Sequence, residues 1–308
     1  MGDGAAAPMS GLKTWFFETR PQFLLLTPVC VLVGLAVAVL QLDSIDTLHF
    51  ILALVGALLA HISVNVLNDY FDFRSGLDLK TNRTPFSGGS GILPSGLLKA
   101  QQVYLFGMVS LLAVIGIGGY FLYEYGWRIL PLGAVGVVVI YFYTTHFTKN
   151  PWVCAIAPGL GFGPLMVMGV YFTQTGEYAL APALASLVPG FLVSNLLLLN
   201  QFPDVEADLT ASRRHIPIAL GKRTAARVYV GLLIAAYLSL VLTVAFEVLP
   251  LTALIGLLTL PPGLKAARGV LKYHDDTGKL IPFMGLNIQV TLLTPLLMAA
   301  GIFLGMLL

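Results

Sequence analysis

Residues 65–78, NVLNDYFDFRSGLD, place two asparagines and three aspartates directly after an apolar run that is long enough to lie in lipid. An α-helix turns by about 100° per residue. With Asn68 at the origin of a helical wheel, Asp72 lies at about 40°. Asn65 and Asp69 follow at about 60° and about 100°. All four side chains share one arc, so this helix end presents a row of amide and carboxylate oxygens suited to a metal ion.

A second stretch, residues 200–208 (NQFPDVEAD), repeats this design. With Asn200 at the origin, Asp204 lies at about 40° and Asp208 at about 80°. Glu206 falls at about 240°, on the far face of the helix. A proline lies inside this turn, so these angles are approximate. The helical period therefore selects three oxygen ligands and leaves the fourth acid outside the cluster.

Basic residues follow both acidic stretches. Mg²⁺ prefers octahedral oxygen coordination that substrate phosphates commonly complete, and Arg and Lys complement the remaining charge of a diphosphate. Two such clusters facing each other predict a site for Mg²⁺ and a diphosphate. In the alternative interpretation, the Asn and Asp residues only cap helices near the lipid headgroups, and the cations only follow membrane topology. The diphosphate ligands expected in these loops are Arg74, Lys80, Arg83, Arg213, Arg214 and Lys222.

The composition is that of a membrane protein. Of the 308 residues, 57% are hydrophobic and 10% are charged, whereas a soluble domain carries about 25% charged residues. Several uncharged blocks reach the roughly 20 residues that cross a bilayer core as a helix, and the short alternating segments of a transmembrane β-barrel do not dominate. A net charge of +2 is too small for a nucleic-acid binder. We therefore predict an all-α polytopic protein whose partner is the lipid bilayer.

Nine membrane spans are predicted, and the basic residues orient them. With nine spans, the loops after the second, fourth, sixth and eighth lie on the side of the N-terminus. Of the 17 Lys and Arg residues, 16 fall on that side, and only Arg128 lies opposite. Such an excess marks the cytoplasmic side, so we expect a bacterial or archaeal cell membrane with the active site facing the cytoplasm. The predicted spans are 21–41, 48–70, 101–123, 128–146, 152–172, 179–202, 225–246, 249–267 and 282–307.

Two long loops on the cytoplasmic side, roughly residues 71–100 and 203–224, follow the acidic helix ends. Within the first, residues 87–91 (SGGSG) are either a flexible linker or a lid whose backbone approaches phosphates. The chain, 1–308, is predicted to be a single domain, and its start, 1–12, is expected to be disordered.

The two acidic stretches resemble those of the UbiA superfamily of intramembrane prenyltransferases, which has nine helices and aspartate-rich motifs on the second and sixth. NDYFDFRSGLD has its last aspartate two residues late, at Asp78, a variant similar to the menaquinone branch of that superfamily. FGPLMVMGVYFTQTG, at residues 162–176, is also similar to that branch. Two segments depart from it: IAPGLGFGP lacks the usual acid, and SRRHIPIALG differs after the second motif. These departures concern the aromatic acceptor more than the prenyl diphosphate.

The resemblance implies a nine-helix bundle with a cytoplasmic-side cap. It also implies Mg²⁺-dependent transfer of a polyprenyl group from a prenyl diphosphate to an aromatic acceptor, namely 1,4-dihydroxy-2-naphthoate in menaquinone biosynthesis. Lys149, after the fourth span, and Arg20, in the Arg-Pro pair before the first, are then expected to contact the diphosphate. Asp72, Asp204 and Asn68 are expected to carry catalysis, and Asn65 to support the metal ligands. The expected ligands are Asn68, Asp69, Asp72, Asp78, Asn200, Asp204 and Asp208.

Other interpretations stay open. His61, on the second span, is either an acid–base group or a packing residue with one hydrogen bond. The same fold supports a terpene cyclase, or a prenyltransferase with another aromatic acceptor. A secondary transporter or Mg²⁺ channel would place its ionisable groups near the bilayer midplane on broken helices, whereas these acids end helices on one side. Incubation with prenyl diphosphate alone separates a cyclase, which forms a hydrocarbon or alcohol, from a transferase.

Overall fold

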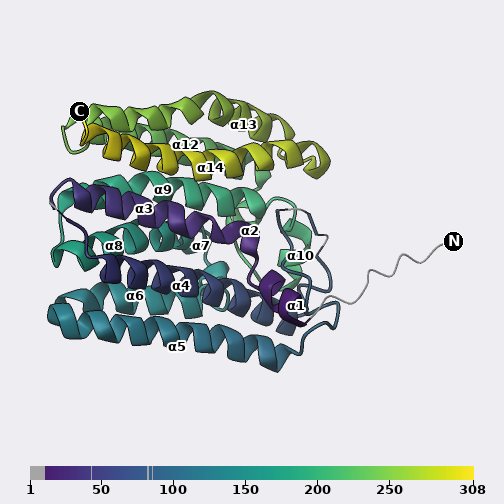
Figure 1. Ribbon diagram of the computed structural model, residues 1–308. Helices are drawn as coiled ribbons and strands as arrows, with labels where there is room; N and C mark the ends of the chain where they lie inside the picture. Colours follow the sequence, from purple (N-terminus) through teal and green to yellow (C-terminus); the bar gives the residue numbers. More distant parts are fainter. Residues whose placement is uncertain (1–10, 43, 82, 85) are drawn as a thin grey trace.

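The computed structural model describes residues 11–42, 44–81, 83–84 and 86–308, and this part of the chain is helical with no β-strand. Its long helices lie side by side in one bundle, whose axis runs horizontally in Figure 1. Of the segment predicted to be disordered, residues 1–10 lie outside the described residues, whereas Gly11 and Leu12 open helix α1.

The helices have the following bounds in chain order. The α-helices are α1 (Gly11–Glu18), α2 (Pro21–Leu24), α3 (Leu26–Val39), α4 (Thr47–Arg74), α5 (Ala100–Tyr125), α6 (Leu130–Phe142), α7 (Pro151–Leu160), α8 (Met166–Thr175), α9 (Leu180–Asn200), α10 (Val205–Thr210), α11 (Ile216–Ala219), α12 (Lys222–Ala245), α13 (Leu260–Tyr273) and α14 (Thr277–Gly305). Short 3₁₀ helices are η1 (Gly126–Ile129), η2 (Phe147–Lys149) and η4 (Leu251–Thr259), and η3 (Gly161–Leu165) is a π-helical turn.

Eight helical segments of the described chain are long and apolar enough to cross a membrane, which makes this an integral membrane protein. One of them, Ala100–Phe142, contains both α5 and α6, which pack against each other after a reversal (Figure 1). Gly126 makes this turn, and its φ of 68° lies in the left-handed region that favours glycine. With α5 and α6 counted separately, the described residues are roughly compatible with the nine predicted crossings, although α6 by itself has only 13 residues. Helix α4 runs to Arg74, beyond the predicted span edge at residue 70, because hydropathy marks where lipid ends and not where the helix ends.

Helix α9 is the most enclosed of these segments and packs against α3, α7, α12 and α14. Small residues allow the close approach. A Cβ added at Gly163 of η3 would lie 2.7 Å from the Cα of Gly190 on α9. Pro158 and Pro164 interrupt the regular helix at this point, and Phe162 between them lines the cavity described below. The break in the fifth span therefore shapes the interior of the bundle.

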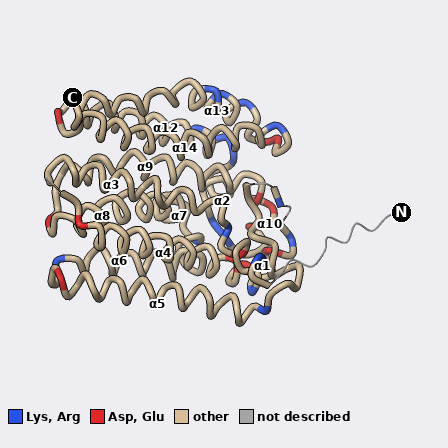
Figure 2. Tube along the Cα trace, in the orientation of Figure 1, with Lys and Arg blue, Asp and Glu red and all other residues tan. Residues whose placement is uncertain are grey.

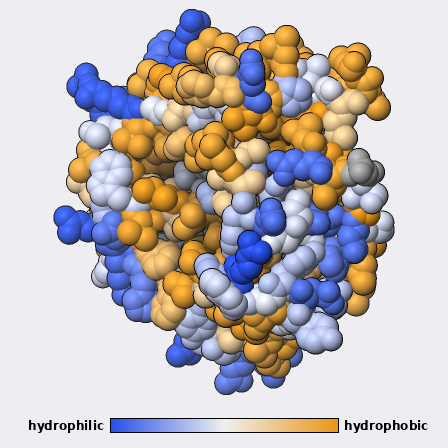
Figure 3. All heavy atoms as spheres, turned by 90° about the vertical axis from the view of Figure 1, so that its left-hand side faces the viewer, coloured by the Kyte–Doolittle hydropathy of each residue, from blue (hydrophilic) through white to orange (hydrophobic). Residues whose placement is uncertain are grey.

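Charged residues gather at one end of the bundle. Figure 2 shows Lys and Arg concentrated toward the right-hand end, together with acidic residues beside α1 and α10. The opposite end faces the viewer in Figure 3, where hydrophobic side chains are interspersed with polar ones. The α4–α5 loop and the segment around α10 both lie at the charged end (Figure 1), so the two predicted acidic clusters are brought to the same end of the protein.

Candidate active site

A cavity of about 460 Å³ lies at the charged end of the bundle and continues between the helices. The two acidic clusters, far apart in the sequence, both contribute to its polar mouth. The polar lining comes from the segment before α2, the end of α4, the loop after α4, the end of α9 and the region around α10. The residues of the mouth are Arg20, Asn65, Asn68, Asp72, Asp78, Asn200, Asp204, Asp208, Arg213 and His215.

The end of α4 presents three of its oxygen ligands to the cavity, as the helical wheel predicts. Asn68 donates from Nδ2 to Asp72 Oδ2 at 3.0 Å and to Thr144 Oγ1 at 3.0 Å. Asn65 donates to the backbone oxygen of Thr19 at 3.0 Å and so ties the helix end to the segment before α2. Asn68 and Asp72 are therefore held in fixed orientations, and Asn65 supports them one turn earlier.

Asp69 is the exception in the first cluster. It does not line the cavity. Its carboxylate forms an ion pair with Arg20 and accepts a hydrogen bond from the backbone N–H of Ser90 at 2.9 Å. Asp69 stands at the edge of the predicted arc, and this edge faces Arg20 and the α4–α5 loop instead of the second cluster. The sequence predicts Asp69 as a metal ligand, but its carboxylate is instead bound by Arg20 and Ser90 outside the cavity lining.

The second cluster does not lie on one continuous helix, contrary to the prediction. Helix α9 ends at Asn200, and α10 begins only after an intervening turn. Pro203 lies in this turn, because proline lacks an N–H donor and its ring clashes with the preceding helical turn. Asn200, Asp204 and Asp208 nevertheless all line the cavity, whereas Glu206 is exposed and does not. The three residues selected by the helical wheel therefore lie at the cavity and Glu206 does not, although the continuous helix is wrong; their role as metal ligands stays a prediction.

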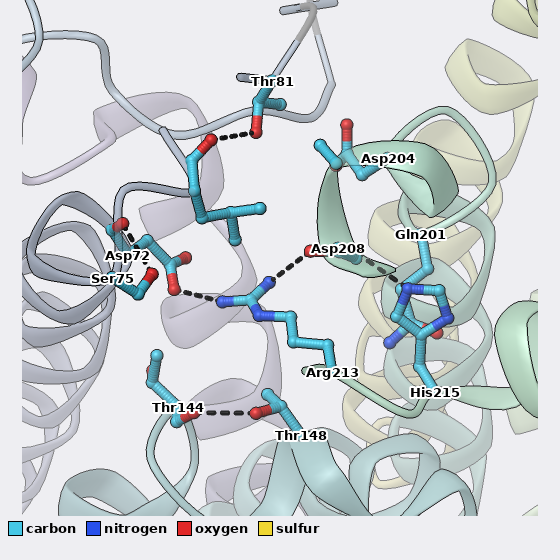
Figure 4. A network of polar contacts seen from close by, with 12 residues as sticks. Asp72, Ser75, Thr81, Thr144, Thr148, Gln201, Asp204, Asp208, Arg213 and His215 are labelled. Atoms are coloured by element: carbon cyan, nitrogen blue, oxygen red, sulfur yellow. Dashed lines mark hydrogen bonds and ion pairs between the residues drawn. The ribbon is translucent and has the colours of Figure 1, made fainter. Parts of the chain in front are cut away.

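Arg213 joins the two clusters (Figure 4). Its Nη2 pairs with Asp72, and its Nη1 lies 3.1 Å from Asp208 Oδ1. The other oxygen of Asp208 lies 2.8 Å from Nε2 of the buried His215. Burial lowers the pKa of Arg213, but the negative charges of Asp72 and Asp208 outweigh this and raise the pKa above its usual range. Arg213 is therefore a permanent cation that bridges carboxylates from both clusters.

The SGGSG segment covers the site as a lid and is not a free linker. Ser87 Oγ donates to Asp204 Oδ1 at 3.2 Å. Ser90 donates from its backbone to Asp69 at 2.9 Å and from its hydroxyl to Glu18 at 3.0 Å. The segment thus connects the second acidic cluster to α1 and to the end of α4. These contacts hold the segment at the cavity mouth.

The lid approaches the acids closely because glycine carries no side chain. Gly89 has a φ of +75° and lines the cavity. A Cβ at this position would lie 3.3 Å from Asp78 Oδ1 and 3.5 Å from Arg20 Nη2. Both the backbone conformation and the short distances therefore favour glycine here.

Two carboxyl groups at the mouth have pKa values above their usual range. The pKa of Asp204 is raised to about 7, first by burial and then by the nearby charge of Asp208. The pKa of Asp78 is raised to about 6 by burial and by the charge of Asp72. A cation bound among these groups would favour their ionised forms. Carboxylate and amide oxygens around one cavity are a donor set that fits a hard divalent cation such as Mg²⁺.

Among the described residues, the acidic side chains at the cavity mouth do not form a ready metal-binding group. In the described ranges, no three His, Cys, Asp or Glu residues are arranged so that they could hold a metal ion. Arg213 pairs with one carboxylate from each cluster, so those oxygens already have a cationic partner. Binding of a divalent cation would require the oxygens to exchange this partner, at least in part.

The predicted diphosphate ligands divide into two groups. Arg20 and Arg213 line the cavity, whereas Lys222 is half-buried outside it. Arg83 donates from Nε to the backbone oxygen of Gly88 at 3.1 Å and so braces the lid. The predicted diphosphate ligands that are exposed and do not line the cavity are Arg74, Lys80, Arg83, Lys149 and Arg214. The structure therefore brings only two of the eight predicted cations to the site.

Lys149 is displaced because its neighbour takes the inward position. Thr148 is buried and lines the cavity, and its backbone oxygen accepts a hydrogen bond from the backbone N–H of Arg214 at 2.8 Å. Adjacent residues of the short helix η2 point in different directions, so Lys149 is exposed. The family resemblance implies Lys149 as the residue at the cavity, whereas the fold places its neighbour Thr148 there.

Two further residues of the site had little signal in the sequence. Glu18 is fully buried at the end of α1, and burial is the main cause that raises its pKa to about 7. In the sequence, Glu18 is marked only by its position two residues before the Arg-Pro pair. No sequence pattern marks His215, because its contact with Asp208 depends on the turn after α10.

Beyond its polar mouth, the cavity becomes apolar. His61 lies at this transition, with Nδ1 2.9 Å from Thr27 Oγ1 and its ring edge-to-face with Phe162 at 4.6 Å. His61 therefore has the single hydrogen bond expected of a packing residue, and it also lines the cavity. The deeper walls come from α4, α5, α6 and α8 and include Leu52, Gly56, Ala57, Ile117, Phe121, Leu132, Gly136, Met166 and Val170. This space can hold a hydrocarbon chain away from water.

Comparisons with known proteins agree with this arrangement. The UbiA prenyltransferase family matches residues 27–293. The chain is 28% identical to a 1,4-dihydroxy-2-naphthoate octaprenyltransferase of Escherichia coli (strain K12), with 96% of this chain and 97% of that protein covered. It is 27% identical to a protein of the same name from Bacillus subtilis (strain 168), with coverage of 88% and 87%.

Solved structures show the same fold. A UbiA homolog from Aeropyrum pernix K1 matches with a TM-score of 0.70 at 16% identity, over 92% of this chain and 98% of that chain. A UbiA homolog from Archaeoglobus fulgidus bound to DMAPP and Mg²⁺ matches with a TM-score of 0.59 at 13% identity, over 92% and 99%. Since the family match spans most of the sequence and the fold agrees with it, the chain belongs to the UbiA prenyltransferase family.

Proposed function

We propose that this protein transfers a polyprenyl group from a prenyl diphosphate to 1,4-dihydroxy-2-naphthoate in menaquinone biosynthesis, with Mg²⁺ as its cofactor. The observation that carries the proposal is one cavity in which two acidic clusters and Arg213 adjoin a deep apolar space. A prenyl diphosphate has the same division into an anionic head and a hydrocarbon tail. The names of the Escherichia coli and Bacillus subtilis relatives support the acceptor.

The oxygen donors of both clusters would hold Mg²⁺. Support comes from the Archaeoglobus fulgidus homolog, which was solved with DMAPP and Mg²⁺. When bound, the metal ion neutralises the diphosphate and stabilises the charge that this group gains as it leaves. The residues that would hold it are Asn68, Asp72, Asp78, Asn200, Asp204 and Asp208, all of which line the cavity.

Arg20 and Arg213 would bind the diphosphate directly. Both line the cavity, and each pairs with a carboxylate of the α4 cluster. A guanidinium group offers several N–H donors in one plane, so it can keep one carboxylate contact and still donate to a phosphate oxygen. Arg213 would then contribute more as the C–O bond breaks, because negative charge accumulates on the leaving diphosphate.

The reacting carbon of the prenyl group would lie at the boundary between the polar and apolar parts. As its bond to the diphosphate oxygen breaks, this carbon becomes an allylic cation. Tyr143 and Phe162 line the cavity there, and aromatic faces stabilise nearby positive charge. The apolar walls would keep away water that would otherwise quench the cation. An electron-rich ring carbon of the acceptor then forms the new C–C bond, and the ring regains its aromaticity by losing a proton from a C–H carbon or CO₂ from the carbon that bears the carboxylate.

The charged end of the bundle would face the cytoplasm. It carries most of the Lys and Arg residues (Figure 2), and basic residues are enriched on the cytoplasmic side of membrane proteins. In this orientation the diphosphate head and the aromatic acceptor reach the cavity from the aqueous side, while the prenyl tail and the product stay in the bilayer.

The function is tested with purified protein, Mg²⁺, a series of prenyl diphosphates, and either 1,4-dihydroxy-2-naphthoate or 4-hydroxybenzoate. We expect a prenylated product of the naphthoate, detected by mass either with its carboxylate or after loss of CO₂, and no product after EDTA treatment until Mg²⁺ is restored. If only 4-hydroxybenzoate is prenylated, the acceptor is a hydroxybenzoate and not the naphthoate. A hydrocarbon or alcohol formed from prenyl diphosphate without any acceptor would instead identify a cyclase.

Glu206→Gln is expected to leave prenyl transfer within about twofold of the wild type, since substitutions at exposed sites change stability by less than about 0.5 kcal/mol. Its side chain is exposed and does not line the cavity. The matched variant Asp208→Asn is expected to lose most activity, because that carboxylate faces the cavity and contacts Arg213 and His215. Turnover per folded molecule compares the two, and equal loss in both would contradict the outward placement of Glu206.

A further inference from the structure

A second group of cations lies outside the catalytic cavity, on α13. Lys265, Arg268 and Lys272 fall within an arc of about 60° on this helix. All three line one hollow on the protein surface, together with Pro261, Leu264, Gly269, Tyr273 and Phe283. None of these residues lines the catalytic cavity. Figure 2 shows the basic positions of α13 toward the charged end of the bundle.

The three cations have no anionic partner within the described part of the protein. The acids of the neighbouring α13–α14 turn are already engaged. Asp276 pairs with Lys279 at 2.9 Å, and Asp275 lies 3.2 Å from His274. Lys265, Arg268 and Lys272 are all exposed. Their mutual repulsion would be relieved by an anion from outside the chain.

Aromatic side chains shape the hollow. The ring of Phe283, from α14, occupies the space that a Cβ on Gly269 would need. Phe283 is stacked on Tyr273 with the ring centroids 5.7 Å apart and the planes 17° from parallel. The Nζ of Lys272 lies 5.0 Å from the centroid of the Tyr273 ring. Stacked rings beside cations are typical of the membrane interface, where apolar and polar surroundings meet.

The place of the hollow in the bundle identifies the kind of anion. It runs along the second half of the spanning segment Leu251–Tyr273 to the start of the segment Thr277–Gly305, so its outer end is where lipid headgroups are expected. Leu264 and Leu271 on the same helix are 47% and 44% exposed, so apolar surface lies beside the cations along α13. A ligand that contacts both surfaces carries a phosphate and a hydrocarbon chain.

We propose that this hollow binds the headgroup of an anionic phospholipid from the leaflet at the charged end of the protein. The phosphate lies among Lys265, Arg268 and Lys272, and the acyl chains follow the exposed leucines of α13. Basic pockets between helix ends on the cytoplasmic side of membrane proteins are known to bind such headgroups. A free phosphate would use the cations but not the apolar surface, which favours the lipid.

The test measures the thermal unfolding midpoint of the full chain in mixed micelles with added phosphatidylglycerol or phosphatidylcholine. Wild-type protein is expected to gain a few degrees with phosphatidylglycerol, saturably, and to gain nothing with phosphatidylcholine. The triple variant K265Q/R268Q/K272Q is expected to lose this gain. The control K13Q/K99Q/R223Q removes the same charge from exposed basic residues outside the hollow and is expected to keep it.

Native mass spectrometry gives a second measurement that does not depend on thermal unfolding. Phosphatidylglycerol is expected to stay bound to the wild type and to the control, and to be lost from K265Q/R268Q/K272Q. Three results would overturn the proposal: no gain with phosphatidylglycerol in the wild type, equal loss in both triple variants, or the same gain with inorganic phosphate. The second result would indicate diffuse surface charge, and the third a site for free phosphate.

Discussion

Replacing Asp72 by Asn is expected to abolish prenyl transfer in a protein that still folds and inserts. Asp72 lines the cavity, pairs with Arg213 and accepts a hydrogen bond from Asn68. The substitution keeps the shape of the side chain but removes the charge proposed to hold Mg²⁺. Loss of one electrostatic contact to the charge that develops in a transition state costs roughly a hundredfold to a thousandfold in kcat, and loss of a metal ligand is expected to cost at least as much.

Asp204→Asn is expected to behave in the same way from the opposite cluster, because Asp204 also lines the cavity and is held by Ser87 of the lid. Asp275→Asn serves as a control, since Asp275 is an exposed acid far from the cavity lining. Turnover is measured per folded molecule at ordinary and at tenfold higher Mg²⁺. Full activity of both cavity variants at ordinary Mg²⁺ would remove the proposed metal site.

Arg213→Gln is expected to reduce both the stability and the turnover of the protein. The side chains of Arg213, Asp72 and Asp208 are 18%, 10% and 3% exposed, so the ion pairs are largely buried. Removing one partner of a buried pair leaves an uncompensated charge and costs about 3–5 kcal/mol. The proposed diphosphate contact is lost too, and a hydrogen bond to a charged group contributes about 1.5–3 kcal/mol, or roughly tenfold to over a hundredfold in rate.

Mg²⁺ is expected to compensate for part of the stability loss in Arg213→Gln. Without the guanidinium, Asp72 and Asp208 are free to bind the metal ion, and a ligand that binds only the folded state stabilises it. The unfolding midpoint is measured in EDTA and in millimolar Mg²⁺, with Arg214→Gln as the control because that neighbour is exposed and outside the cavity lining. A midpoint equal to the wild type in EDTA would show that the bridge does not contribute to stability.

Much of the fold could be predicted because its determinants are local. A spanning helix satisfies its own backbone hydrogen bonds in lipid, so an apolar block of sufficient length is enough to predict one. The 16 basic residues on one side then set the alternation of the loops. The same local rule placed Asn65, Asn68 and Asp72 on one face of α4, where they line the cavity.

The site itself required the tertiary structure wherever a contact joins distant segments. Arg213 and Lys149 were both plausible diphosphate ligands in sequence, yet only Arg213 reaches the cavity. No periodicity within either segment could decide this, because the answer depends on how the turn after α10 packs against α4. The SGGSG segment was equally undecided, and its contact with Asp204 makes it a lid.

The amino-acid sequence by itself therefore determined the membrane class, the approximate number of crossings and the face of α4 that carries Asn65, Asn68 and Asp72, because these depend on hydropathy or on helical period. Only the tertiary structure decided which of the predicted ligands face one another and which cations accompany them. Asp69 shows the difference, because it lies on the predicted arc but turns to Arg20 and Ser90. The physical reason is that burial and pairing of charged groups depend on neighbours brought together by packing, and those neighbours are far apart along the chain.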